Sequence, residues 1–236
     1  MLLKADQKPS ARYLTELASS HPCRQHPLFA HLRTRTLSKE QAVSLLVNYD
    51  AHATLLRRLL LKAAAFMPEP AVGFILENVR NEYGNGDYRL CHQGQLRSII
   101  DHLGGGAGFV SAQAITKGVR QYLIRIGELY CRKNPMPKLC GGRAAIAAGA
   151  ITATELMAIE EFKAMQVAFA HFGLAEHAWF DHVNVECEHG EESLALAAYF
   201  MQNNQGCEAV EFGFQQTLNT NVLLYDGLLE AIMPST

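Results

Sequence analysis

The chain has 236 residues, of which 49% are hydrophobic, and its 21 basic and 23 acidic residues leave a formal net charge of −2. Neither sign forms a long run, which excludes a basic footprint for nucleic acid or for an anionic membrane surface. The length suits one large domain or two small ones and allows a substantial core. Nothing in the sequence demands two, so we expect a single domain over residues 1–236 whose partner is a small molecule.

The N-terminal segment, residues 1–14, carries charged residues and lacks the apolar core and cleavage site of a secretory signal. The six cysteines are scattered without a Cys-x-x-Cys pair, which is typical of reduced thiols. No stretch reaches the roughly 18 uncharged apolar residues that a membrane-spanning helix needs. We therefore expect a cytoplasmic protein that contacts no membrane.

Apolar residues recur every three or four positions through most of the chain, which predicts helices. Ser38-Lys-Glu-Gln41 reads as a capping box that opens a helix to about Phe66, and prolines 68 and 70 end that helix. A second helix is expected over 71–83. It breaks at Gly84 and Gly86 and resumes near Asp87 for a run to residue 103.

The cluster Gly104-Gly-Gly-Ala-Gly108 predicts a loop, and it lacks the strand and Gly-Lys-Ser/Thr that a phosphate-binding loop needs. Asn134-Pro-Met-Pro137 marks a further break. The remaining helices are expected over 111–132, 144–171 (ended by Gly173), 175–203 and 208–232, with Gly206 between the last two. The sequence thus predicts an all-α bundle of about seven helices.

Two histidines and a carboxylate lie in the segment from Phe180 to His189. The spacing of His182, Glu186 and His189, four residues and then three, puts the three side chains on one face of a helix. Such a stripe is typical of metal ligands. Cys187 is rotated away from this face, and we expect it to pack in the core.

Further candidate ligands occur upstream. Glu82 and His92 bracket the loop of residues 83–87, and Glu155 is the only charged residue between Ala144 and Ile159. A carboxylate on such an apolar helix is costly to bury without a cation or a hydrogen-bonded partner, although a glutamate at a helix end or an interface is the alternative. Three carboxylates and three imidazoles without cysteine favour two ions of iron or manganese.

These residues resemble a known family, the haem-oxygenase-like diiron oxidases and oxygenases, which are relatives of thiaminase II and pyrroloquinoline-quinone synthase. His26-Pro-Leu-Phe29 and Leu37-Ser-Lys-Glu-Gln41 resemble the N-terminal region of the whole fold. Glu82-x-Gly-x-Gly-x5-His92 and His182-x3-Glu186-x2-His189 resemble the motifs of the diiron branch. Glu186 departs from that pattern, because the family normally has an aspartate there.

The resemblance implies a haem-oxygenase-like bundle, two irons per chain, with manganese as an alternative, and a homodimer. The implied ligands are Glu82, His92, Glu155, His182, Glu186 and His189. The family's third carboxylate lies on the helix before the histidine stripe, where Glu160 and Glu161 are rivals of Glu155 on a more polar stretch next to Lys163. We prefer Glu155.

The implied activity is the activation of O2 to oxidise a small metabolite, derived from an amino acid or a fatty acid. Tyr49, Asp50, His52 and Tyr83 either face the cavity or serve ordinary packing and surface polarity. Two alternatives stay open: a metal-free enzyme like thiaminase II or pyrroloquinoline-quinone synthase, and a non-catalytic helical protein that binds metal or regulates. Haem oxygenation is a weaker candidate, because no isolated histidine can be assigned as an axial ligand.

Overall fold

The computed structural model describes residues 11–105, 115–131 and 142–233, and of residues 11 and 182–188 only the backbone. The described residues form nine α-helices and no strand, so the predicted all-α fold is confirmed, with two more helices than the seven expected. The predictions for residues 106–108, 111–114 and 134–137 and for the side chain of Cys187 lie outside the described residues. The α-helices are α1 (Ala11–Ser20), α2 (Pro27–Thr34), α3 (Lys39–Ala64), α4 (Glu69–Glu82), α5 (His92–His102), α7 (Lys117–Cys131), α8 (Gly142–Phe169), α9 (His182–Phe200) and α10 (Asn204–Ile232).

The extra helices, α1 and α2, precede the predicted capping box. The imidazole of His26 caps α2 by accepting a hydrogen bond from the backbone N–H of Leu28, and Pro27 occupies the first helical position. The Nε2 atom of His26 also lies 3.1 Å from Oδ1 of Asp226 in α10, and this contact connects the start of α2 to the last helix. Both helices are short, so only tertiary contacts such as this one make them stable.

The capping box of α3 is confirmed, since Ser38 accepts from the backbone of Gln41 and the Gln41 side chain accepts from the backbone of Ser38. Pro68 ends the turn after α3 and is itself the N-cap of α4, which begins two residues earlier than expected. Between α4 and α5 lie two 3₁₀ turns, Gly84–Gly86 and Tyr88–Leu90, where a continuous helix from Asp87 was expected.

Two further boundaries differ from the prediction. The expected helix 175–203 begins only at His182, after a 3₁₀ turn over Ala178–Asp181. The placement of Gly206 between two helices is wrong, because Asn203 caps α10 by accepting from the backbone N–H of Gly206, which lies in the first turn. A Cβ at Gly206 would collide with the carbonyl oxygen of Phe200, so the glycine permits a tight junction between α9 and α10.

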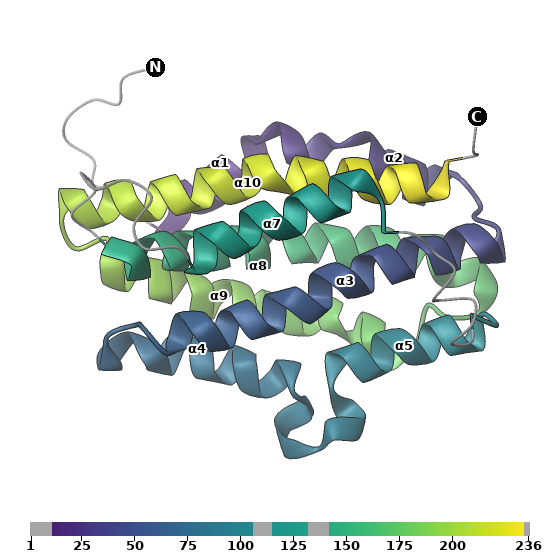
Figure 1. The fold of residues 1–236 in the computed structure, drawn as a ribbon, viewed down its shortest axis with the longest axis horizontal. Helices are drawn as coiled ribbons and strands as arrows, with labels where there is room; N and C mark the ends of the chain where they lie inside the picture. Colours follow the sequence, from purple (N-terminus) through teal and green to yellow (C-terminus); the bar gives the residue numbers. More distant parts are fainter. Residues whose placement is uncertain (1–10, 106–114, 132–141, 234–236) are drawn as a thin grey trace.

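Helix α8 forms the centre of the bundle, between α10, α9 and α2 (Figure 1). Its side chains are buried on every side rather than along one stripe, which is typical of a core helix. By length and composition, Gly142–Phe172 could cross a membrane, and 72% of its most apolar window is covered by the rest of the bundle. Gly173, with φ of 75°, ends this segment in the left-handed conformation, as predicted.

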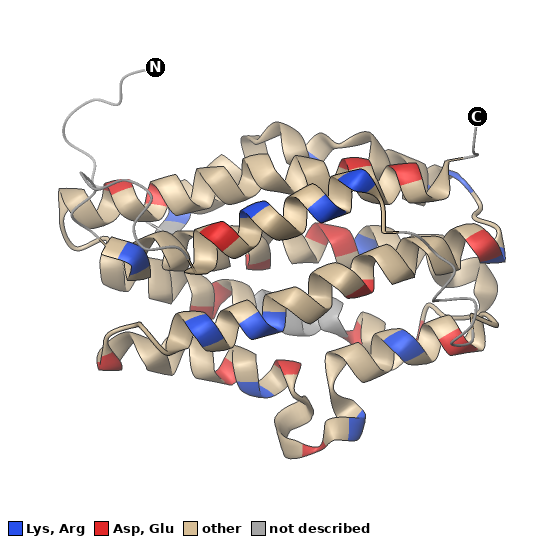
Figure 2. Cartoon of the chain, in the orientation of Figure 1, with Lys and Arg blue, Asp and Glu red and all other residues tan. Residues whose placement is uncertain are grey.

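Helices α8 and α10 approach each other closely at two glycines. A Cβ at Gly149 would collide with the carbonyl of Val210, and one at Gly213 would collide with the carbonyl of Ile146. Each glycine therefore lets the opposite backbone come into contact. Acidic and basic residues alternate along the helices, with no long run of one sign in this view (Figure 2).

Candidate metal centre

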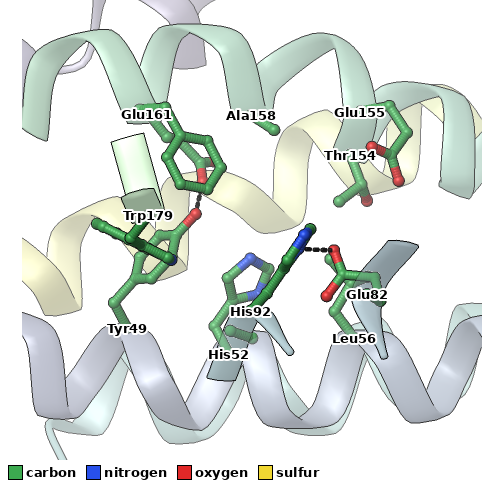
Figure 3. Close-up of a pocket in the computed structure, with 12 residues that line it drawn as sticks. Tyr49, His52, Leu56, Glu82, His92, Thr154, Glu155, Ala158, Glu161 and Trp179 are labelled. Atoms are coloured by element: carbon green, nitrogen blue, oxygen red, sulfur yellow. Dashed lines mark hydrogen bonds and ion pairs between the residues drawn. The ribbon is translucent and has the colours of Figure 1, made fainter. Parts of the chain in front are cut away.

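A small cavity of about 40 Å³ lies between α3, α4, α5 and α8, and three of the six predicted ligands line it. Glu82, His92 and Glu155 lie toward one end, and Tyr49, Glu161 and Trp179 toward the other (Figure 3). Apolar side chains such as Leu56, Ala158 and Phe162 complete the wall. The cavity thus joins a group of potential metal ligands to a largely aromatic space.

Glu82 and His92 are brought together by the turn between α4 and α5. Their Oε1 and Nδ1 atoms lie 3.0 Å apart (Figure 3). Gly84 adopts a φ of +73°, and a Cβ there would lie 2.7 Å from the backbone nitrogen of Cys91. The Sγ atom of Cys91 caps α5 by accepting from the N–H of Gly94. The first glycine of the Glu-x-Gly-x-Gly motif is therefore needed for the close approach of the two ligand-bearing ends.

Glu155 and His189 form a second pair, deeper in the bundle, where α8 packs on α9. Both residues are 5% exposed, and Oε2 of Glu155 lies 3.9 Å from Nδ1 of His189. Asn78 of α4 donates a hydrogen bond of 2.8 Å to Oε1 of Glu155. This amide orients the carboxylate and offsets part of the cost of its burial.

His182 and Glu186 lie on the first two turns of α9, on the same helix as His189, as their spacing predicts. Their side chains lie outside the described residues, so the prediction that they are ligands stays a prediction.

Glu160 and Glu161, the two rivals of Glu155 on α8, contact other side chains than the candidate ligands. Glu160 forms ion pairs with Arg33 and, at 3.5 Å, with Arg24, and it does not line the cavity. Glu161 does line the cavity but accepts hydrogen bonds from Tyr49 at 2.8 Å and Tyr225 at 2.6 Å. Of the three glutamates, Glu155 is the one near Glu82, His92 and His189.

Four residues of α3 and the α4–α5 turn were expected either at the cavity or in ordinary packing, and two of them line the cavity. Tyr49 and His52 line the cavity, and burial lowers the pKa of His52 to about 4, so the imidazole is neutral at physiological pH. Asp50 accepts hydrogen bonds from Arg97 at 3.1 Å and Gln93 at 3.2 Å. Tyr83 lies under the guanidinium of Arg57, whose central carbon is 5.2 Å from the ring centroid.

Sequence reasoning missed Asn78 and gave Glu161 only the role of a rival ligand. Nothing in the residues around Asn78 marks it, because its partner Glu155 is 77 positions away. Glu161 had a signal, since it is an acid six residues after Glu155 on the same long, mostly apolar helix. Trp179 is 2% exposed and also lines the cavity.

Among the described side chains, no three histidines, cysteines or acids converge tightly enough to form a complete metal site. The described donors instead form two mixed pairs, Glu82 with His92 and Glu155 with His189. Each pair offers one carboxylate oxygen and one imidazole nitrogen, which iron, manganese and zinc all accept. The donor set therefore fits a metal centre in its chemistry.

Comparisons with known proteins agree on the fold. A family model described as an iron-containing redox enzyme matches residues 40–221. No curated protein matches the sequence. The structure is similar to a CADD-like protein of unknown function from Nostoc punctiforme, with a TM-score of 0.72 and 16% identity over 94% of this chain and 96% of that chain.

It is also similar to a domain of unknown function with a haem-oxygenase-like fold from Shewanella denitrificans, with a TM-score of 0.70 and 11% identity over 93% of this chain and 90% of that chain. A TenA family transcription regulator from a Silicibacter species gives a TM-score of 0.63 and 11% identity over 98% and 100% of the two chains. At such identities these likenesses show the haem-oxygenase-like fold and no shared activity.

Proposed function

This chain belongs to the family of iron-containing redox enzymes, and from that membership we propose that it is a non-haem diiron oxidase or oxygenase. It uses O2 to oxidise a small metabolite. The six proposed ligands are those named from the sequence: Glu82, His92, Glu155, His182, Glu186 and His189.

One observation carries the proposal. Glu82, His92 and Glu155 come from three different helices and line the same cavity, and His189 approaches Glu155 from a fourth helix. Metal centres in helical bundles draw their carboxylates and imidazoles from facing helices in this way. Ordinary packing does not explain why two nearly buried carboxylates face two imidazoles around an open space.

Two irons, when bound, supply the electrons and the oxygen chemistry that amino-acid side chains lack. The chain supplies orientation and exclusion of water. Asn78 holds the Glu155 carboxylate through one oxygen, which leaves the other oxygen directed to His189. Leu56 and Phe162 cover the cavity, and neutral His52 adds no positive charge that would repel a metal ion.

The first experiment measures iron uptake. Metal-free protein titrated anaerobically with Fe(II) should take up about two ions per chain and then consume O2 on exposure to air. His92→Ala and His189→Ala should each lose bound iron, because each removes an imidazole ligand.

The matched control is His102→Ala, since His102 is an exposed histidine at the other end of α5. It should bind iron as the unmodified protein does. Full iron uptake by His189→Ala would contradict the proposed centre.

The metal-free alternative has less support. A thiaminase-like reaction depends on a cysteine nucleophile, and none of the described cysteines lines the cavity. The described cysteines are Cys23, Cys91, Cys131 and Cys207.

A further inference from the structure

Glu161 is a buried acid that the proposed metal centre does not use. Its residue is 6% exposed, and it lines the cavity from α8 at the end away from Glu155 (Figure 3). The hydroxyl of Tyr49 donates to its Oε2 at 2.8 Å, and that of Tyr225 donates to its Oε1 at 2.6 Å. A carboxylate offers about four lone pairs, so two hydroxyl donors leave it able to accept further hydrogen bonds.

The partners of Glu161 carry no positive charge. In the described part of the chain, no lysine, arginine or histidine forms an ion pair with it. Burial raises the pKa of the Glu161 carboxyl above its ordinary value, and the two tyrosine hydrogen bonds oppose that rise. A buried carboxylate without a counter-ion is unfavourable, and a cation placed beside it would remove that cost.

The walls next to Glu161 are aromatic. The ring centroid of Trp179 lies 5.7 Å from that of Tyr49 and 4.9 Å from that of Phe162, and all three side chains line the cavity. Aromatic faces attract cations, and an ammonium group gains most from them where water is excluded. The carboxylate and the rings therefore favour the same kind of ligand.

We infer that this end of the cavity binds the primary ammonium group of the substrate, with Glu161 as its counter-ion. The substrate is then a small metabolite that carries a primary amine, rather than a fatty acid. A carboxylate at this position would face Glu161 with like charge, and an alkyl chain would leave Glu161 without a counter-ion. That the bound amine is oxidised rests on the proposed function; that it binds does not.

The binding test uses the intrinsic fluorescence of Trp179, because it is the only tryptophan in the chain and lines the cavity. Metal-free protein is titrated near neutral pH with propylammonium, propionate and propanol, which have the same carbon chain. Propylammonium should change the emission at a concentration at least about tenfold lower than the other two, as expected for a charge-assisted hydrogen bond.

Glu161→Gln is the decisive variant, because it keeps the shape of the side chain and removes its charge. It should lose the preference for propylammonium. Glu160→Gln is the matched control, since Glu160 is the adjacent acid, pairs with Arg24 and Arg33 and does not line the cavity; it should keep the preference.

Equal responses to propylammonium and propionate, no response to propylammonium, or an unchanged preference in Glu161→Gln would each overturn the inference. If Glu161→Gln does not fold, the three ligands compared on the unmodified protein still decide it.

Iron uptake separates this inference from the proposed function. Glu161→Gln should bind Fe(II) as the unmodified protein does, because its carboxylate is held by two tyrosines away from the proposed ligands. If the unmodified protein prefers propylammonium but takes up no iron, the diiron proposal fails and the ammonium site stands. If it takes up iron but shows no preference for propylammonium, the ammonium site fails and the diiron proposal stands.

Discussion

At the scale of single residues, burial sets the charge of His52, which lines the cavity. His52 is enclosed by the aromatic rings of Tyr49 and Tyr122, with centroids 5.2 Å from its own in both cases. Burial disfavours the imidazolium and lowers the pKa of His52 to about 4, although the negative charge of Glu82 acts in the opposite direction.

This depressed pKa predicts a stability that depends on pH. Between pH 6.5 and about 4, the unfolded chain protonates His52 while the folded metal-free protein keeps it neutral, so the free energy of unfolding falls as the pH is lowered through that range. The expected loss is roughly 3 kcal/mol. Urea denaturation at a series of pH values should show it.

The comparison is with His52→Gln, which lacks the titrating group and should show a correspondingly smaller fall in the free energy of unfolding. The control His102→Gln changes an exposed histidine and should behave as the unmodified protein does. The same pH dependence in His52→Gln and the unmodified protein would show that His52 is not the group responsible.

At the scale of elements, the contact between α8 and α10 depends on two glycines. Gly149→Ala and Gly213→Ala each place a methyl group against a carbonyl of the opposite helix, which the two helices can relieve only by separating. We expect each substitution to lower the free energy of unfolding by roughly 2 kcal/mol or more. Thermal and urea denaturation measure the loss.

Gly127→Ala is the matched control, since Gly127 lies inside α7 and, apart from the surrounding backbone of α7 itself, no heavy atom lies within 4 Å of a Cβ built there. There the higher helix propensity of alanine should raise stability by about 0.5–1 kcal/mol. Stabilisation by Gly149→Ala of similar size would mean that the helices are not in close contact at this glycine.

The elements also show what local sequence can predict. Two ends with local signals were correctly predicted: Ser38 caps α3 with its side chain, and Gly173 ends the segment after α8 because glycine readily adopts the left-handed conformation. The start of α10 was not, because Gly206 reads as a helix break unless the contact with Phe200 is known. Helices α1 and α2 were missed for a related reason: they are short and depend on contacts with distant helices.

At the scale of the whole molecule, the candidate centre joins α4 and α5 to a pair of helices distant in sequence, α8 and α9. Residue types and helical spacing predicted which side chains could bind metal, but spacing along one helix carries no information about which other helix faces it. Glu155 could be preferred over Glu160 because a lone acid on an apolar helix needs a partner. The identity of that partner, His189 with Asn78 beside it, required the packing of α9 on α8 and α4.

A centre that joins α4, α5, α8 and α9 should stabilise the entire bundle when metal binds. Fe(II) at concentrations about a hundredfold above its dissociation constant should raise the melting temperature by roughly 5 to 10 °C under anaerobic conditions. Differential scanning calorimetry measures the shift. Mg²⁺, which prefers oxygen donors alone, is the control and should produce little change. An equal shift in His189→Ala would contradict the assignment of His189 as a ligand.

The position of both key acids on α8 has a further consequence for the reaction. Glu155 and Glu161 are separated by six residues of one helix, a rise of about 9 Å. If Glu155 holds iron and Glu161 holds the nitrogen of the substrate, the part of α8 between them fixes the distance from the oxidant to that nitrogen. The rise of the helix between the two acids would then decide which carbon reacts. That carbon lies only a few bonds from the nitrogen, whichever amine is bound.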